Sequence, residues 1–169
     1  MTQRTHLHLI LAATLAIAAI AVAQDPTAPP PSQHAILAAT GKGVQIYTCQ
    51  QSATGAQWVF QAPEATLTDS TGNPVGTHGA GPVWISKDGS SVKGEVLQKS
   101  ASPDPTSIPW LLLKAASVSG SGIMTKAEFI RRSGTHGGIA PATGCDAQHL
   151  NATVRVPYTA TYTFYSAKP

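Results

Sequence analysis

The feature that most constrains this chain is an alternation of apolar and hydroxyl side chains near its C-terminus. In YTATYTFY (158–165), Tyr158, Ala160, Tyr162 and Phe164 alternate with threonines at 159, 161 and 163. Successive side chains of a β-strand point to opposite faces of the sheet. The pattern therefore predicts a strand with one buried face.

The same period of two recurs along the chain between segments that are typical of turns. It is found in VQIYTCQ (44–50), in QWVFQ (57–61) and on both sides of Asp88-Gly89, a dipeptide that favours a tight hairpin. We expect an all-β domain, either an antiparallel sandwich or a barrel, with about seven to nine short strands. The segment 123–132 fits a strand or two helical turns equally well, and both interpretations stay open.

The N-terminus has the three parts of a cleavable signal peptide. Arg4 precedes an apolar run from Leu9 to Val22, and Ala21-Val22-Ala23 is a small-x-small cleavage site. The run is shorter than the roughly twenty residues that cross a bilayer, so we expect no stable membrane anchor. The predicted organisation is a signal peptide over 1–23, a Pro-rich, poorly ordered linker over 24–35, and a single β domain over 36–169.

Two cysteines, Cys49 and Cys145, remain after the predicted cleavage. An exported protein, periplasmic or secreted, folds in an oxidising compartment, where an even number of thiols favours a disulfide. A Cys49–Cys145 bridge would close a long loop and tie an early strand to the Gly-rich segment 133–149. Neither cysteine lies in a motif typical of a nucleophile.

Composition and motifs exclude several classes of function. Eleven Lys and Arg stand against eight Asp and Glu, and the only adjacent basic pair is Arg131-Arg132, so we expect no nucleic-acid partner. The Gly-x-Gly segments lack the third glycine of a dinucleotide fingerprint. His78, His136 and His149 are too scattered to predict a metal site. We expect neither a metal nor another cofactor.

Seven segments of the chain together resemble the DUF3455 family, secreted proteins of bacteria and fungi whose function is uncharacterised. The matching segments are GVQIYTCQ (43–50), WVFQAPEATLTD (58–69), VGTHGAGPVW (75–84), DGSSVKG (88–94), IPWLLLKA (108–115), GGIAPATGCDA (137–147) and VPYTATYTFY (156–165). They occur in order over nearly the whole predicted domain. The resemblance implies secretion and a single domain, and it implies no activity.

The most suggestive candidate for binding is the loop that carries His78. Glycines flank this histidine, so backbone N–H groups could approach a ligand, while His78 and Trp84 would supply a polar contact and a stacking face. The alternative is a strained connection between two strands, with Trp84 in the core and His78 either hydrogen-bonded locally or alone in solvent. Arg132 could bind an anionic group, although such residues often lie on a solvated strand edge.

Three classes of function remain open. The first is a non-catalytic, extracytoplasmic binding module for a cell-wall component, a glycan or a secreted protein. The second is a structural, envelope-associated protein without a small ligand. The third is an enzyme of unrecognised type, for which the sequence offers no catalytic residue: no nucleophile elbow occurs, and the acidic residues suggest no pair.

The cleavage site generates a first prediction. Because Ala21-Val22-Ala23 fits signal-peptide cleavage, the protein recovered outside the cytoplasm should begin at Gln24. Intact-mass spectrometry of the exported protein checks this. Retention of Met1 in that protein would contradict it.

Overall fold

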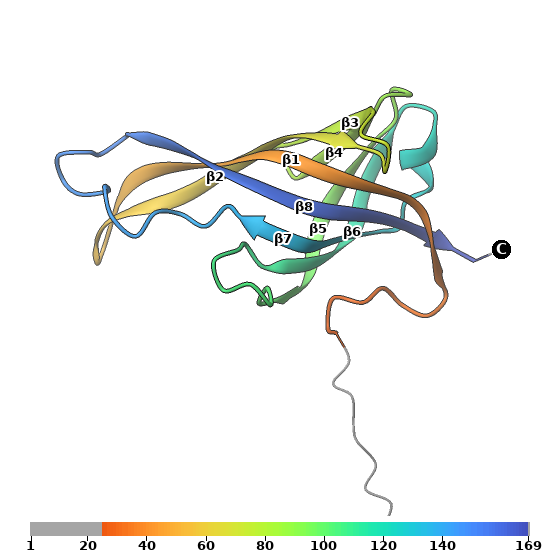
Figure 1. The fold of residues 1–169 in the computed structure, drawn as a ribbon, viewed down its shortest axis with the longest axis horizontal. Coiled ribbons are helices and arrows are strands. Elements are labelled where there is room, and N and C mark those ends of the chain that lie inside the picture. Colours follow the sequence, from red (N-terminus) through yellow and green to blue (C-terminus); the bar gives the residue numbers. More distant parts are fainter. Residues whose placement is uncertain (1–24, 169) are drawn as a thin grey trace, which may run out of the picture.

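The computed structural model describes residues 25–168, which form one antiparallel sheet of eight strands (Figure 1). The elements are β1 (Gln33–Ser52), β2 (Gly55–Thr68), β3 (Pro74–Gly79), β4 (Val83–Ser86), β5 (Ser91–Ser100), β6 (Trp110–Ser119), a short 3-10 helix η1 (Ile123–Lys126), β7 (Phe129–Gly137) and β8 (Thr153–Ala167). The predicted all-β class is confirmed.

The sheet closes on itself. Each strand pairs with the next along the chain, and β8 returns to pair with β1, from Gln33 opposite Ala167 to Thr48 opposite Thr153. The structure is therefore a closed barrel, which decides between the two predicted architectures. Closure pairs the first strand with the last, so neither of them is an edge of the sheet within the barrel.

The inward-facing side chains fill one end of the barrel. Tyr158, Ala160, Tyr162 and Phe164 of β8 are all buried, as the alternation predicts. They belong to a core that also contains Leu67, Trp84, Val92, Leu113 and Ile130 from other strands. Buried Met124, from η1, belongs to the same core.

The ambiguous segment 123–132 divides into two elements. Ile123–Lys126 forms the 3-10 helix, and a strand begins at Phe129. Long-range contacts hold the helix, since the Ile123 N–H donates to Asp88 Oδ2 at 2.9 Å and the Met124 N–H donates to Ser90 Oγ at 3.1 Å. The β4–β5 turn supplies both acceptors, and local periodicity could not show them.

The linker predicted over 24–35 differs in the structure, and the domain begins before the predicted Ile36. Strand β1 starts at Gln33, Thr27 is fully buried, and the carboxylate of Asp25 pairs with Arg131. Arg131 also lies over the ring of Trp110, 5.2 Å from its centroid. These contacts hold the Pro-rich segment against the barrel. The predicted signal peptide (1–23) lies outside the described residues.

No helix in the described part of the chain, residues 25–168, has both the length and the apolar character needed to span a membrane.

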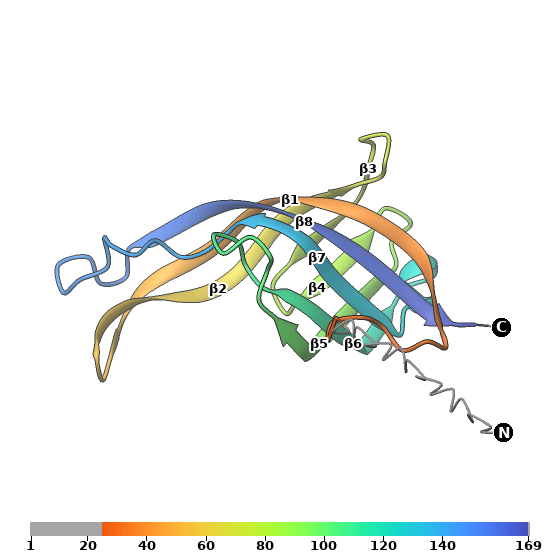
Figure 2. The same ribbon diagram turned by 60° about the horizontal axis from the view of Figure 1, so that its bottom comes forward.

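Strands β1 and β2 and the start of β8 continue past the barrel as an arm, which is visible in both views (Figures 1 and 2). The predicted Cys49–Cys145 disulfide forms here, with a Cα–Cα distance of 5.3 Å. It joins β1 to the Gly-rich segment between β7 and β8. The indole N–H of Trp58 adds a hydrogen bond to the Thr143 carbonyl at 3.0 Å. The long loop is therefore tethered.

The disulfide generates a prediction about stability. It spans 96 residues in sequence, so on the chain-entropy model the double variant Cys49→Ser/Cys145→Ser should lose about 4 to 5 kcal/mol of unfolding free energy. Urea denaturation measures the loss, and the wild type with reductant serves as the matched control. A loss below about 1 kcal/mol in both samples would show that the bridge contributes little.

Candidate functional site

The barrel contains a cavity of about 570 Å³. Side chains from all eight strands line it, together with loop residues. The lining residues are Gln45, Tyr47, Phe60, Gln61, Pro63, His78, Gly81, Pro82, Trp84, Val96, Lys99, Ile108, Pro109, Leu111, Leu113, Arg132 and Tyr162. Most of these side chains are apolar or aromatic, as in the usual small-molecule site.

Stacked rings form the inner wall of the cavity. His78 of β3 and Trp84 of β4 are cross-strand partners, and their rings lie parallel with centroids 4.4 Å apart. Tyr162 of β8 packs against both, at 4.9 Å from His78 and 5.6 Å from Trp84. The three rings present an aromatic surface inside the barrel.

His78 is buried and electrically neutral at pH 7. It is 4% exposed, and Nδ1 lies 2.9 Å from the Val83 carbonyl, which can only accept, so Nδ1 carries the proton. Burial lowers the pKa of His78 to about 4, and the positive charge of Arg132 acts in the same direction, although the hydrogen bond to Val83 opposes them.

Arg132, on β7, is the cation within the cavity wall. Its Nε and Nη2 donate to the Pro109 carbonyl at 3.1 and 2.8 Å. Burial lowers its pKa, and the phenols of Tyr162 and Tyr158 partly offset this; arginine nevertheless stays charged in proteins. Among residues 25–168 no carboxylate pairs with Arg132, in contrast to its neighbour Arg131, which pairs with Asp25.

Two buried N–H donors in the wall also lack acceptors. Gln45 is 3% exposed and Trp84 is 1% exposed. Neither Gln45 Nε2 nor Trp84 Nε1 has a hydrogen-bond partner within the described chain. Buried polar groups are nearly always paired, so these two nitrogens stand out in a wall that is otherwise mainly apolar.

The three binding candidates from the sequence, His78, Trp84 and Arg132, all line this cavity. Trp84 belongs to the core, as the alternative to a binding loop expects, although it also lines the cavity. His78 is hydrogen-bonded locally, to the Val83 carbonyl, as that alternative also allows. It is buried against Trp84. That these residues bind a ligand stays a prediction.

Sequence reasoning missed Gln45, Tyr47 and Phe60 as cavity residues. A signal for Gln45 was present, since it shares the period-two face of Tyr47 and Cys49, and this face is the buried one. A glutamine on an inward face is unusual. No signal in the sequence places Phe60 at the cavity. A register shift in the β1–β2 pairing sets it opposite Tyr47, and only the structure shows this shift.

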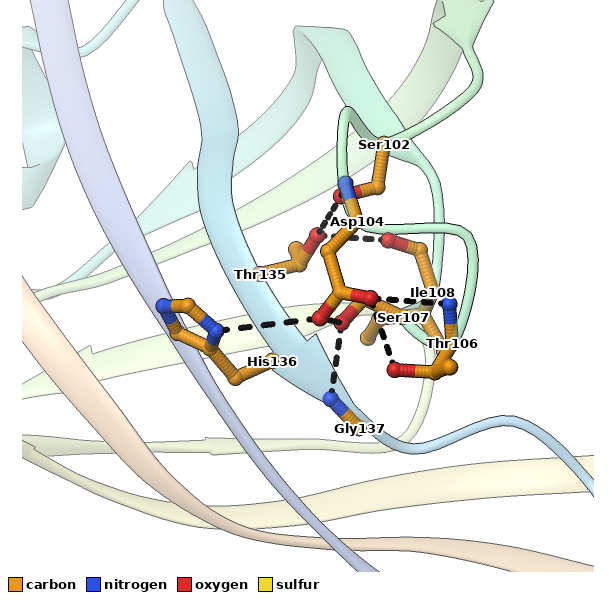
Figure 3. Close-up of polar contacts among 8 residues, drawn as sticks. All are labelled: Ser102, Asp104, Thr106, Ser107, Ile108, Thr135, His136 and Gly137. Carbon is orange, nitrogen blue, oxygen red and sulfur yellow. Dashed lines mark hydrogen bonds and ion pairs between the residues drawn. The ribbon is translucent and has the colours of Figure 1, made fainter.

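A polar cluster beside the cavity mouth has a structural role (Figure 3). Asp104 accepts hydrogen bonds from Ser107 Oγ at 2.6 Å and Thr106 Oγ1 at 2.7 Å, while His136 Nδ1 lies 3.8 Å away. These bonds, led by the one from Ser107, lower the pKa of Asp104 to about 2. The carboxylate lies between serine and histidine, so the imidazole cannot take the hydroxyl proton as a triad requires.

The cluster instead fixes the loop between β5 and β6. Gly137 N donates to Ser107 Oγ at 2.9 Å, and Thr135 Oγ1 donates to the Ile108 carbonyl at 2.7 Å. Ile108 and Pro109 line the cavity, so these bonds hold one side of its mouth to β7. Within residues 25–168, no three His, Cys, Asp or Glu side chains are grouped to hold a metal ion.

Comparison with known families identifies the chain's relatives. The sequence profile described as "Protein of unknown function (DUF3455)" matches residues 29–73 and 70–166. The chain belongs to the DUF3455 family. Searches of curated proteins and of solved structures find no significant match. The cavity of this DUF3455 protein must therefore be interpreted from its own geometry.

The buried histidine generates a prediction about pH. The pKa of His78 is about 4 in the folded state and about 6.5 when unfolded, so the unfolded chain binds the proton first. Stability should therefore fall by about 3 kcal/mol as pH drops from about 6.5 to about 4. His78→Phe, which keeps a ring but cannot titrate, should lack this part of the pH dependence.

Urea denaturation across this pH range measures the effect. His34 is exposed on β1, so His34→Gln is the matched control and should keep the wild-type slope. If the free energy of unfolding changed equally with pH in the wild type and in His78→Phe, the result would contradict the prediction and show that His78 can protonate in the folded protein.

Proposed function

We propose that this DUF3455 protein is an extracytoplasmic binding protein that holds a small, largely apolar ligand inside its barrel. The observation that supports this most is the cavity of about 570 Å³, lined from all eight strands. Its volume lies in the range of known small-molecule pockets, and eight-stranded barrels are wide enough to hold one small ligand.

The character of the wall favours an apolar ligand over a glycan. Stacked His78, Trp84 and Tyr162 line the interior, and Leu111 and Leu113 lie along β6. Polar groups are few, whereas a sugar would leave many hydroxyls without partners in such a cavity. An apolar small molecule therefore fits the cavity better than a glycan, which is one of the partners expected from the sequence.

The mouth of the cavity also supports binding from solution. Phe60 and Val96 line it and are 49% and 52% exposed. Large apolar side chains left in solvent at the opening of an apolar cavity extend the surface that a ligand can contact. The mouth is anchored on one side by the Asp104 cluster, so its shape is largely preorganised.

Export is part of the proposal. The Cys49–Cys145 disulfide suits an oxidising compartment, and the predicted signal peptide at 1–23 agrees with it. Such a protein would capture its ligand in the periplasm or outside the cell.

The neutral, apolar fluorophore N-phenyl-1-naphthylamine tests the proposal. The mature wild-type protein should bind it saturably with enhanced fluorescence. Leu111→Trp fills the cavity and should weaken binding at least about tenfold, a loss typical of an occluded apolar contact. Ile85→Trp adds the same side chain at an exposed position of β4 and should bind like the wild type.

Circular dichroism checks that each variant folds, and Val96→Trp at the mouth replaces Leu111→Trp if the latter does not. Absence of saturable binding to the wild type, or equal binding by the filled and control variants, would contradict the proposed function.

A further inference from the structure

Arg132 places a positive charge in the cavity wall with no negative partner. The lining residues include Arg132 and Lys99 but no Asp or Glu. The ion pairs of residues 25–168 lie elsewhere, at Arg131, His136, His149 and Arg155. A partly buried charge is costly unless it is compensated, and the backbone carbonyl of Pro109 offers only partial compensation.

The guanidinium is also held in a fixed orientation. Its two bonds to the Pro109 carbonyl use Nε and Nη2, and a guanidinium carries five N–H donors. The Pro109 carbonyl is itself positioned by the loop that the Asp104 cluster fixes to β7. The guanidinium of Arg132 therefore has a defined position in the cavity wall.

The other polar groups without partners in this wall are donors as well. Gln45 Nε2 and Trp84 Nε1 are buried and lack acceptors among the described residues. Two buried donors without acceptors and one cation without a carboxylate partner, in a wall without acidic side chains, favour an acceptor that carries negative charge.

We infer that the ligand carries a single carboxylate that pairs with Arg132, while its apolar body lies against the rings of His78, Trp84 and Tyr162. This inference rests on the proposed function. A carboxylate matches the planar guanidinium fork. A doubly charged phosphate ester matches less well, because the second lining cation, Lys99, is exposed.

The chemistry of His78 is consistent with one charge at the site. Burial keeps this ring neutral at pH 7, so it offers the ligand an apolar face instead of a second cation. The charge available to a ligand deep in the cavity is therefore that of Arg132.

The test compares 2-naphthoate with 2-naphthamide, which have nearly the same shape and differ in charge. Each displaces N-phenyl-1-naphthylamine from the mature wild-type protein at pH 7. The carboxylate should bind at least about tenfold more tightly than the amide, as expected for hydrogen bonds to a charged group. 2-Naphthyl phosphate should bind more weakly than 2-naphthoate.

Arg132→Gln should reduce the ratio of the carboxylate and amide affinities to about one. Arg131→Gln is the matched control, because it removes the same charge from the adjacent residue, which pairs with Asp25 away from the cavity. It should keep the wild-type ratio. Folding of both variants is verified by circular dichroism.

The outcomes separate the two proposals. The wild type could bind the neutral fluorophore saturably and yet bind 2-naphthoate and 2-naphthamide with nearly equal affinity. This result would overturn the carboxylate assignment and leave the proposed binding function in place. Tighter binding of the phosphate would also overturn it. No binding of any of the four compounds would overturn both. If Arg132→Gln does not fold, the wild-type ratio alone decides.

Discussion

The pairing of β1 with β8 is the interaction on which the rest of the structure depends. It joins the two ends of the domain over the length of β1 and turns a meander into a closed barrel. Close packing on both sides of β1 requires glycine: a Cβ at Gly41 would lie 2.6 Å from the Tyr162 ring of β8, and one at Gly43 would lie 1.9 Å from the Glu64 carbonyl oxygen of β2. Without closure, the inward faces of the eight strands would not enclose a cavity.

The open end of the barrel is held by a second set of long-range contacts. The Cys49–Cys145 disulfide ties the Gly-rich loop to β1, and the Tyr47 hydroxyl donates to the Gly138 carbonyl at 2.6 Å. On the other side, the Asp104 cluster joins the β5–β6 loop to β7. Loops of this length are costly to order. Their anchoring around the mouth indicates a preformed opening, which lowers the entropic cost of binding.

The polar groups in the cavity wall are unfavourable for the stability of the fold. A barrel interior is most stable when it is filled by apolar side chains, yet this one contains unpaired donors on Gln45 and Trp84 and the guanidinium of Arg132. The two donors carry a desolvation cost without an acceptor, and the cost of burying Arg132 is offset only in part, by the Pro109 carbonyl and the phenols of Tyr162 and Tyr158. Departures of this kind are found at functional sites. These three lie around one space, while two further buried atoms without partners, Gln33 Oε1 and Trp110 Nε1, belong to residues outside its lining.

The sequence by itself determined the strands, the disulfide and the family, because these depend on local alternation, on cysteine number and on motifs in order. It also singled out His78, Trp84 and Arg132, since glycines beside a histidine and a pair of adjacent arginines can be recognised in the sequence. Only the tertiary structure decided that the sheet closes into a barrel, that residues 25–32 pack against it, and that His78 stacks on Trp84 inside. The physical reason is that period two says which side chains share a face of a strand. This period does not determine which strands pair with each other. The burial of His78, its lowered pKa and the cavity all depend on that pairing.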